Sequence, residues 1–353
     1  MHKNNFDFLR LLFATLVVVH HCYPISGFSE QDPLYYFSNH TLSYSYLGVR
    51  GFFVISGYLI FQSLYRSKNI LDYLVKRILR IYPALFVVLI LSMLVCSTAY
   101  NGTVIDYFKN KSTWTYVPVN LLLIKLQLGI QGVFEDIPFR SVINGSLWTI
   151  IYEFSMYLFL IPFLWIKHFN ETQKKRIVFF VLLLLFVARL TLHEYKDWHI
   201  GALAFGQWIH FAVLFMSGAL LSILQIEKYK FRNVLLIVCL ILFFACMPFS
   251  FYEKLQYFIL PPIVIIIGAA ATKGLSSIGE KIGDISYGTY IYGFPIQQLL
   301  MHYFSFDIVS LLLVSLPLTL LFGWLSWHLV EKHILNKKKK VYEKLMSIST
   351  IKR

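Results

Sequence analysis

Charged residues are scarce in this chain. Only 14% of its 353 residues are Asp, Glu, Lys or Arg, about half of the roughly 25% that is usual for a soluble domain. Hydrophobic residues make up 58%. This composition excludes a soluble enzyme of this length. Because a membrane span needs about 20 apolar residues plus a connector, we expect an all-α, polytopic membrane protein with about ten transmembrane helices.

Metal-binding and disulfide patterns are lacking as well. The four cysteines lie in or beside apolar runs, with no CxxC pair and no histidine at metal-ligand spacing. We therefore expect small core residues and no metal site. The first apolar run contains Asp7 and Arg10 and has no small-residue cleavage site, so we expect a retained helix rather than a cleaved signal.

Apolar runs bounded by charges or turn residues mark the expected spans. They lie at about 6–25, 45–65, 82–100, 146–166, 177–194, 205–224, 233–250, 256–272, 285–303 and 307–329. We treat 1–335 as one membrane domain and 336–353 as a basic cytoplasmic tail. The segment 101–145 lies outside the membrane in this scheme. Its short apolar run at 120–130 is too short to cross, and predicts a re-entrant or interfacial helix.

Lysine and arginine are unevenly distributed over the connecting segments. With both termini in the cytoplasm, 24 of the 32 basic residues fall on the cytoplasmic side, as the positive-inside rule requires. Lys3 is counted on that side and Lys196 on the opposite side. The net charge of +14 then reflects orientation in a bacterial inner membrane and gives no reason to expect nucleic acid as a partner.

Ionisable residues inside a span are functional candidates, because an unpartnered charge in hydrocarbon is costly. Arg10 and His21 are 11 residues apart, which places them within about 20° of each other on one helical face, with His21 about 16 Å further along the axis. His20 is rotated about 80° away from that face. If one histidine lines a cavity with Arg10, it is His21. Alternatively, one or both histidines lie at the outer membrane interface.

The second span combines small residues with a charge. Gly48, Gly51, Ser56 and Gly57 allow close helix packing, and the glycines with Ser56 are also candidates for the wall of a passage through the bilayer. Arg50, near the outer end, either snorkels to the interface or holds an anion.

Two arginines follow this span at a spacing of three. Arg77 and Arg80 in DYLVKRILRIYP share a helical face. They indicate either an interfacial helix that attracts anionic lipid or a phosphate-binding patch, since guanidinium groups match phosphate geometry.

The fourth span carries a polar stripe of Thr149, Glu153 and Tyr157, spaced i, i+4 and i+8. A carboxylate at this depth indicates either a structural hydrogen bond or a direct role in a site. Arg189 is a plausible structural partner for it. In the ninth span, Tyr287 and Tyr290 line the passage or belong to an interfacial aromatic belt.

Together these segments resemble the integral-membrane acyltransferase-three family, which includes bacterial O-antigen and exopolysaccharide O-acetyltransferases. Six motifs occur in the family's order, from residue 5 to about residue 331. They are FDFLR with His21 eleven residues after its arginine, GVRGFFVISGYLI, YLVKRILRIYP, SLWTIIYEFSMYL, DISYGTYIYGFP and LVEK.

The resemblance implies an acyltransferase with acyl-CoA, usually acetyl-CoA, as the donor and a glycan hydroxyl as the acceptor. The family's first-helix arginine and histidine fall on Arg10 and His21, and its basic pair falls on Arg77 and Arg80. Its Trp-Thr and Glu fall on Trp148, Thr149 and Glu153. Two positions depart from the family, which often has Asp in place of Arg50 and His near Gly293.

We therefore expect His21 to act as a general base on the acceptor hydroxyl, with an acyl-histidine intermediate as the alternative. Glu153 would orient His21 or hold the acceptor, and Arg10, Arg77 and Arg80 would bind CoA. The competing class is a non-enzymatic transporter or flippase of a lipid-linked glycan, which also places polar groups at mid-membrane.

Overall fold

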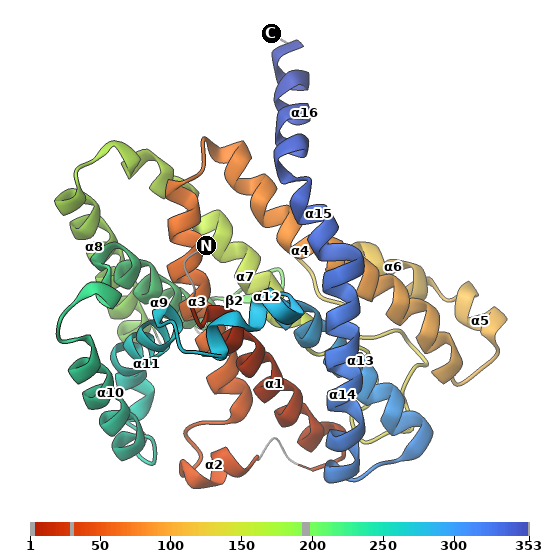
Figure 1. Ribbon diagram of the computed structural model, residues 1–353. Coiled ribbons are helices and arrows are strands. Elements are labelled where there is room, and N and C mark those ends of the chain that lie inside the picture. The colour runs from red at the N-terminus through yellow and green to blue at the C-terminus, as the bar shows by residue number, and fades with distance from the viewer. Residues whose placement is uncertain (1–3, 29–31, 193–197, 352–353) are drawn as a thin grey trace.

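The computed structural model describes residues 4–28, 32–192 and 198–351, and this part of the chain is almost entirely helical (Figure 1). Its one sheet is a short hairpin of β1 (His199–Ile200) and β2 (Leu203–Ala204). The expected all-α class is confirmed. Lys3 and Lys196, both used in assigning the topology, lie outside the described residues, as does the end of the span expected at 177–194.

A long helix occupies each of the ten ranges expected to cross the membrane. These helices are α1 (Phe6–Ile25), α3 (Tyr44–Tyr65), α4 (Ile70–Val95), α7 (Leu147–Phe159), α8 (Glu171–Thr191), α9 (Phe205–Leu224), α10 (Arg232–Cys246), α11 (Tyr252–Ala269), α13 (Ser286–Phe304) and α14 (Ile308–Ser326). Seven helical stretches in the described part are long and apolar enough to span a bilayer, and α8, α10 and α13 are not among them. The count of ten and the cytoplasmic location of both termini stay expectations.

Shorter elements connect the long helices. They are α2 (Pro33–Phe37), α5 (Val104–Lys109), α6 (Lys111–Leu121), α12 (Ile278–Ile282), α15 (Lys332–Asn336) and α16 (Lys338–Ile351), with 3-10 turns η1 (Cys96–Ala99), η2 (Ile161–His168), η4 (Ile226–Lys228) and η5 (Leu275–Ser277), and a π-helical turn η6 (Trp327–Glu331). The tail beyond residue 336 thus contains a helix, α16, which packs against α4.

Helix α4 begins twelve residues before its expected span. The side chain of Asn69 caps its first turn by accepting from the backbone N–H of Asp72, and the helix continues through Pro83 without a break. The basic segment at 72–83 is therefore the first half of the helix that was expected to start at residue 82. Arg77 and Arg80 thus lie on a rigid element of the bundle.

The apolar run at 120–130 is not a helix, contrary to expectation. Helix α6 ends at Leu121, and the side chain of Asn120 then bonds the backbone of Gln127 at the far end of a loop. It donates to the carbonyl of Gln127 at 2.8 Å and accepts from the N–H of Gln127 at 3.1 Å. This amide closes the loop and satisfies backbone groups that a continued helix would have paired.

Helices α1, α3 and α9 form the tightly packed centre of the bundle. A Cβ atom on Gly57 of α3 would lie 1.8 Å from the carbonyl oxygen of Phe215 on α9, and one on Gly218 of α9 would lie 2.1 Å from the carbonyl oxygen of Val54. Gly48 and Gly51 are likewise closed against Phe13 of α1. These glycines set the helix spacing and do not form the wall of a passage.

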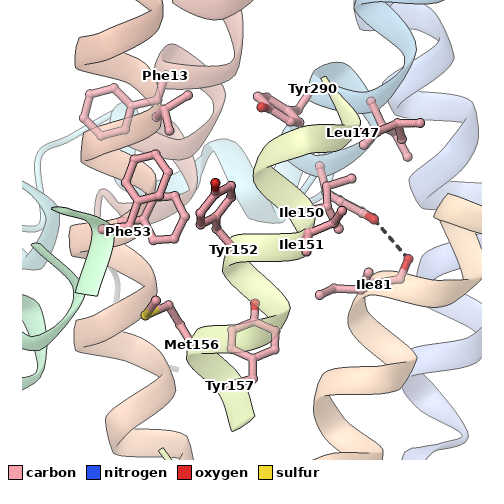
Figure 2. Packing of buried hydrophobic residues seen from close by; sticks show 14 of the residues in the cluster. Phe13, Phe53, Ile81, Leu147, Ile150, Ile151, Tyr152, Met156, Tyr157 and Tyr290 are labelled. Atoms are coloured by element: carbon pink, nitrogen blue, oxygen red, sulfur yellow. Dashed lines mark hydrogen bonds between the residues drawn. The ribbon is translucent and has the colours of Figure 1, made fainter. Parts of the chain in front are cut away.

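The two ends of the bundle are distinct in Figure 1. The turn from α3 to α4 and helix α16 lie at one end, which we call the α16 end. Helix α2 and the turn from α13 to α14 lie at the opposite end, which we call the α2 end. Helix α7 is placed between α3 and α4, with Tyr152 toward Phe53 and Ile150 toward Ile81 (Figure 2). This arrangement encloses the cavity described next.

Candidate active site

A cavity of about 720 Å³ lies between α1, α3, α4, α7 and α13 and extends to the α16 end. This is within the usual size of a small-molecule site. Arg66 and Lys338 line it at that end. It brings together nine of the residues selected from the sequence, namely Arg10, Ser56, Arg77, Arg80, Thr149, Glu153, Tyr157, Tyr287 and Tyr290.

Three of the selected residues do not line this cavity. Trp148 is 37% exposed and packs its ring on Tyr152 and Phe211. Arg50 points elsewhere from α3, with its guanidinium 5.0 Å from the ring centre of Tyr46. His21 lies further toward the α2 end than the cavity.

Two carboxylates neutralise two of the cavity arginines. Arg10 Nη1 and Arg80 Nη2 donate to the same oxygen of Asp284, at 3.0 and 2.7 Å. Arg80 also donates to Glu331 at 3.2 Å. Ser286 donates to the other oxygen of Asp284 at 2.7 Å. The network joins α1, α4, α13 and η6, so that Arg10 and Arg80 hold the bundle together as well as lining the cavity.

Sequence reasoning did not select Asp284 and Glu331, although both stand inside motifs that were recognised. Each lies at the edge of a span, where a carboxylate has no need of a partner in the bundle. Glu331 is nevertheless 1% exposed, because the π-helical turn η6 carries it inward to Arg80 and Ser326. For Asp284, burial acts to raise the pKa of the carboxyl, but Arg80 and Arg10 hold that pKa below its ordinary value.

Arg77 differs from its two neighbours. In the part of the chain that the structure describes, no carboxylate lies within salt-bridge distance of it. Its Nη2 donates to the Ser63 hydroxyl at 3.2 Å, its guanidinium lies over the rings of Tyr73 and Tyr157, and its buried Nε has no hydrogen-bond partner. A buried donor without a partner is costly, and among the described residues no carboxylate compensates the charge of Arg77, in contrast to Arg10 and Arg80.

Glu153 lies on the wall of the cavity. It accepts hydrogen bonds from the hydroxyls of Ser56, at 3.3 Å, and Tyr157, at 2.5 Å. Arg189 is not its partner, because Arg189 Nε donates to Tyr257 at 3.0 Å. The stripe of Thr149, Glu153 and Tyr157 does face the cavity, and the Thr149 hydroxyl bonds that of Tyr290 at 2.5 Å.

His21 and His20 have different surroundings near the α2 end. The ring of His21 contacts Phe294 edge-on at 5.0 Å between centroids, and its buried Nδ1 has no hydrogen-bond partner. Phe294 follows Tyr290 by one turn of α13, so His21 lies just beyond the Tyr290 end of the cavity. His20 Nδ1 is paired instead with the buried carboxylate of Asp32 at 2.8 Å. Asp32 also accepts from the backbone N–H groups of Tyr35 and Tyr44, so the pair fastens the segment between α1 and α3.

Metal ligands do not gather anywhere in the described residues: no group of three or more His, Cys, Asp or Glu side chains is placed to hold an ion. Cys22, Cys96 and Cys239 are buried free thiols, and Cys246 is a partly buried one.

Comparisons with known proteins agree with these features. A family model described as an acyltransferase domain matches residues 3–328. An O-acetyl transferase of Shigella phage Sf6 is 30% identical over 345 residues, covering 96% of this chain and 98% of that protein. Nodulation protein 10 of Rhizobium leguminosarum bv. viciae is 33% identical over 167 residues, 45% of this chain and 43% of that protein. No solved structure matches the chain. Since the family match extends over nearly its whole length, the chain belongs to the integral-membrane acyltransferase-three family and is an acyltransferase.

Proposed function

We propose that this enzyme transfers an acetyl group from cytoplasmic acetyl-CoA to a hydroxyl of a cell-surface or lipid-linked glycan, in a bacterial inner membrane. The observation that carries the donor half of this proposal is the unpaired Arg77 in a cavity that opens toward a basic end. Transfer of an acetyl group to an oxygen is supported by the phage O-acetyl transferase, whose similarity extends over nearly the full length of both chains.

The cavity has the charges that CoA requires. Arg77 offers a guanidinium with an unpartnered N–H, and guanidinium groups match phosphate oxygens well. Arg66 and Lys338 add exposed positive charge at the α16 end. Arg10 and Arg80 approach the same space but are held by Asp284 and Glu331. In this proposal, Arg77 holds the diphosphate, and the pantetheine arm runs inward along Ser56 and Ile60.

The reaction forms an ester and breaks a thioester. The acceptor hydroxyl attacks the thioester carbonyl carbon, the new C–O bond forms, and the C–S bond breaks to release CoA as its thiol once the hydroxyl proton reaches the sulfur. In this proposal His21 takes that proton as a general base, with an acyl-histidine intermediate as the alternative route. In the described residues, its Nδ1 has no hydrogen-bond partner and Glu153 bonds Ser56 and Tyr157, which favours an orienting role for Glu153 less than contact with a substrate. Glu153 is left to bind the acceptor or the acyl group.

The two substrates approach from opposite ends. The donor cavity ends at Tyr290 and Thr149, and His21 lies beyond Tyr290 against Phe294. For the hydroxyl, the thioester and His21 to meet, the contact between the Tyr290 and Phe52 rings, 5.8 Å apart, has to open. We assign Tyr290 to the inner wall of this passage.

Binding of CoA to the purified protein tests the donor half. We expect CoA to raise the melting temperature of the wild-type protein in detergent, because a ligand that binds only the folded state stabilises it. Pantetheine, which lacks the phosphates, serves as the matched ligand control. The absence of any CoA-dependent shift would contradict the proposal.

Mass spectrometry of the envelope glycans tests the acceptor half. Cells with and without the gene are compared, and the expected difference is one acetyl group on a glycan, lost on mild alkaline treatment as an ester is. Identical glycan masses in the two strains would contradict a glycan acceptor while leaving donor binding intact.

A further inference from the structure

A second cluster of basic side chains lies outside the active-site cavity, toward the α2 end. It is formed by Arg50 on α3, Arg189 on α8 and His210 on α9, gathered around Tyr257 on α11. Both guanidinium groups act electrostatically on His210 and on Tyr257. None of these four residues lines the active-site cavity.

The cluster is separated from the cavity by helix α3 itself and by an aromatic layer. Ser56 lines the cavity, and Arg50 is rotated from it by about 120° around the helix axis. The rings of Phe53 on α3 and Phe211 on α9 stack at 4.0 Å between these two regions. A ligand at Arg50 would therefore not share the space proposed for CoA.

The hydrogen bonds inside the cluster leave its charge uncompensated. Arg189 Nε donates to the Tyr257 hydroxyl at 3.0 Å, and this hydroxyl bonds His210 Nδ1 at 2.5 Å. Tyr257 thus accepts from Arg189, and it either donates to or accepts from His210 according to the tautomer of that ring. Among the described residues, no carboxylate lies within salt-bridge distance of Arg50 or Arg189. Glu253, the acidic residue that acts on Arg50, is exposed.

Two polar atoms of the cluster are buried without a hydrogen-bond partner. They are Arg50 Nη1 and the hydroxyl of Tyr252, a residue that acts electrostatically on Arg50. The Arg50 guanidinium lies 5.0 Å from the ring centre of Tyr46. An unpaired guanidinium inside a membrane bundle is costly. The two arginines and the Tyr252 phenol offer spare hydrogen-bond donors. An oxyanion accepts hydrogen bonds from donors of this kind.

We propose that Arg50 and Arg189, with Tyr252, bind a phosphate group at the α2 end of the bundle. A phosphate offers oxygens to both guanidinium groups and to the Tyr252 hydroxyl, and its charge offsets the two positive charges of the cluster. The phosphate belongs either to the headgroup of an anionic lipid or to a soluble phosphate. Because the cluster lies inside a bundle of spanning helices, a lipid headgroup at the membrane surface is the nearer source.

Thermal unfolding in defined lipids and salts tests this site. Wild-type protein is compared in nanodiscs of phosphatidylcholine and of phosphatidylglycerol, and separately in detergent with inorganic phosphate against chloride at matched ionic strength. We expect phosphatidylglycerol to raise the melting temperature by several degrees, and native mass spectrometry to detect one retained phosphatidylglycerol. Stabilisation by inorganic phosphate alone would identify a soluble phosphate as the ligand. Stabilisation by neither would overturn the proposal.

Matched variants separate the site from the overall positive charge of the chain. Arg50→Gln and Arg189→Gln are each expected to remove most of the shift, whereas Lys254→Gln, an exposed charge on α11 at the same end, retains it. Arg189→Gln keeps the test informative if Arg50→Gln does not fold. An equal shift in wild type and Arg189→Gln, or a loss in Lys254→Gln as large as in Arg189→Gln, would overturn the assignment.

Discussion

Arg80 on α4 donates from Nη2 to Asp284, 204 positions further along the chain, at 2.7 Å. The contact ties the donor-side arginines to the start of α13, and Asp284 shares its oxygen with Arg10 of α1. Three helices that meet at the cavity are thus held by one carboxylate. Loss of that carboxylate would leave Arg80 with Glu331, and Arg10 with Asp7 at 3.8 Å, as the remaining acidic partners.

Asp284→Asn is therefore expected to destabilise the protein on the order of 3 kcal/mol, the usual cost of removing one partner from a buried ion pair. Thermal unfolding in detergent measures this loss. Glu171→Gln is the matched control, because Glu171 is exposed where it pairs with Lys174 in the first turn of α8, and an ion pair of an exposed carboxylate contributes about 0–1 kcal/mol. Equal melting temperatures for wild type and Asp284→Asn would contradict a structural role for the network.

The ionisation of Asp284 predicts that the stability of the protein depends on pH. Arg80 and Arg10 overcome the effect of burial and hold the pKa of Asp284 below its ordinary value, so its stabilising contribution is present above about pH 4 and is lost as the pH falls through the lowered pKa. We expect the destabilisation of Asp284→Asn relative to wild type to be present at about pH 5 and to shrink in more acidic buffer. A difference that grows in more acidic buffer would contradict this ionisation state.

Arg77→Gln is expected to weaken CoA binding by about 10- to 100-fold, because a hydrogen bond to a charged group contributes about 1.5–3 kcal/mol. Stability should change little, since Arg77 has no carboxylate partner among the described residues. The CoA concentration dependence of the melting temperature measures both quantities. Arg176→Gln, an exposed arginine on α8, is the control for general loss of charge. Unchanged CoA affinity in Arg77→Gln would remove Arg77 from the donor site.

Much of this arrangement could be predicted from the sequence, because membrane spans and polar residues within them obey strong local rules. Helical phase placed Thr149, Glu153 and Tyr157 on one face, and that face lines the cavity. On α1, helical phase alone does not predict which residues line the cavity. Arg10 and His21 share a face, yet the residues between them span three turns, so one lies in the cavity and the other beyond its end.

The rest depends on contacts between distant segments, which no local pattern encodes. Asp284 and Glu331 stand at span edges and become buried only because α4 brings Arg80 to them. The sequence suggests Arg189 as a partner for Glu153, because the two residues have opposite charges and both lie inside spans. Helix packing instead places Arg189 against Tyr257. The small residues of α3 have two roles, lining the cavity and allowing close helix packing. Only the structure shows that Ser56 has the first role and that Gly57, which packs against α9, has the second.

The adjacent histidines should respond differently to substitution. His21→Ala is expected to reduce acetylation about 10²- to 10⁴-fold at equal folded protein, the usual contribution of a general base. His20→Ala should instead lower stability by about 1–3 kcal/mol, because it leaves the buried carboxylate of Asp32 without one partner. In-membrane acetylation assays and melting temperatures measure the two effects. Full activity in His21→Ala, or loss of turnover only in a well-folded His20→Ala, would contradict this assignment.

The C-terminal helix is expected to contribute to donor recognition although it follows the matched family region. Lys338, the first residue of α16, lines the cavity together with Arg66, and this end is where the 3′-phosphate of a bound CoA would emerge. An exposed charge about 4 Å from a phosphate contributes about 1 kcal/mol, so Lys338→Gln should raise KM for acetyl-CoA about fivefold and leave kcat unchanged. The variant should also discriminate less between CoA and 3′-dephospho-CoA. Lys340→Gln is the control, because Lys340 is an exposed charge on the same helix that does not line the cavity. An equal effect of the two substitutions on KM would show that acetyl-CoA binding depends only on the overall charge of the tail.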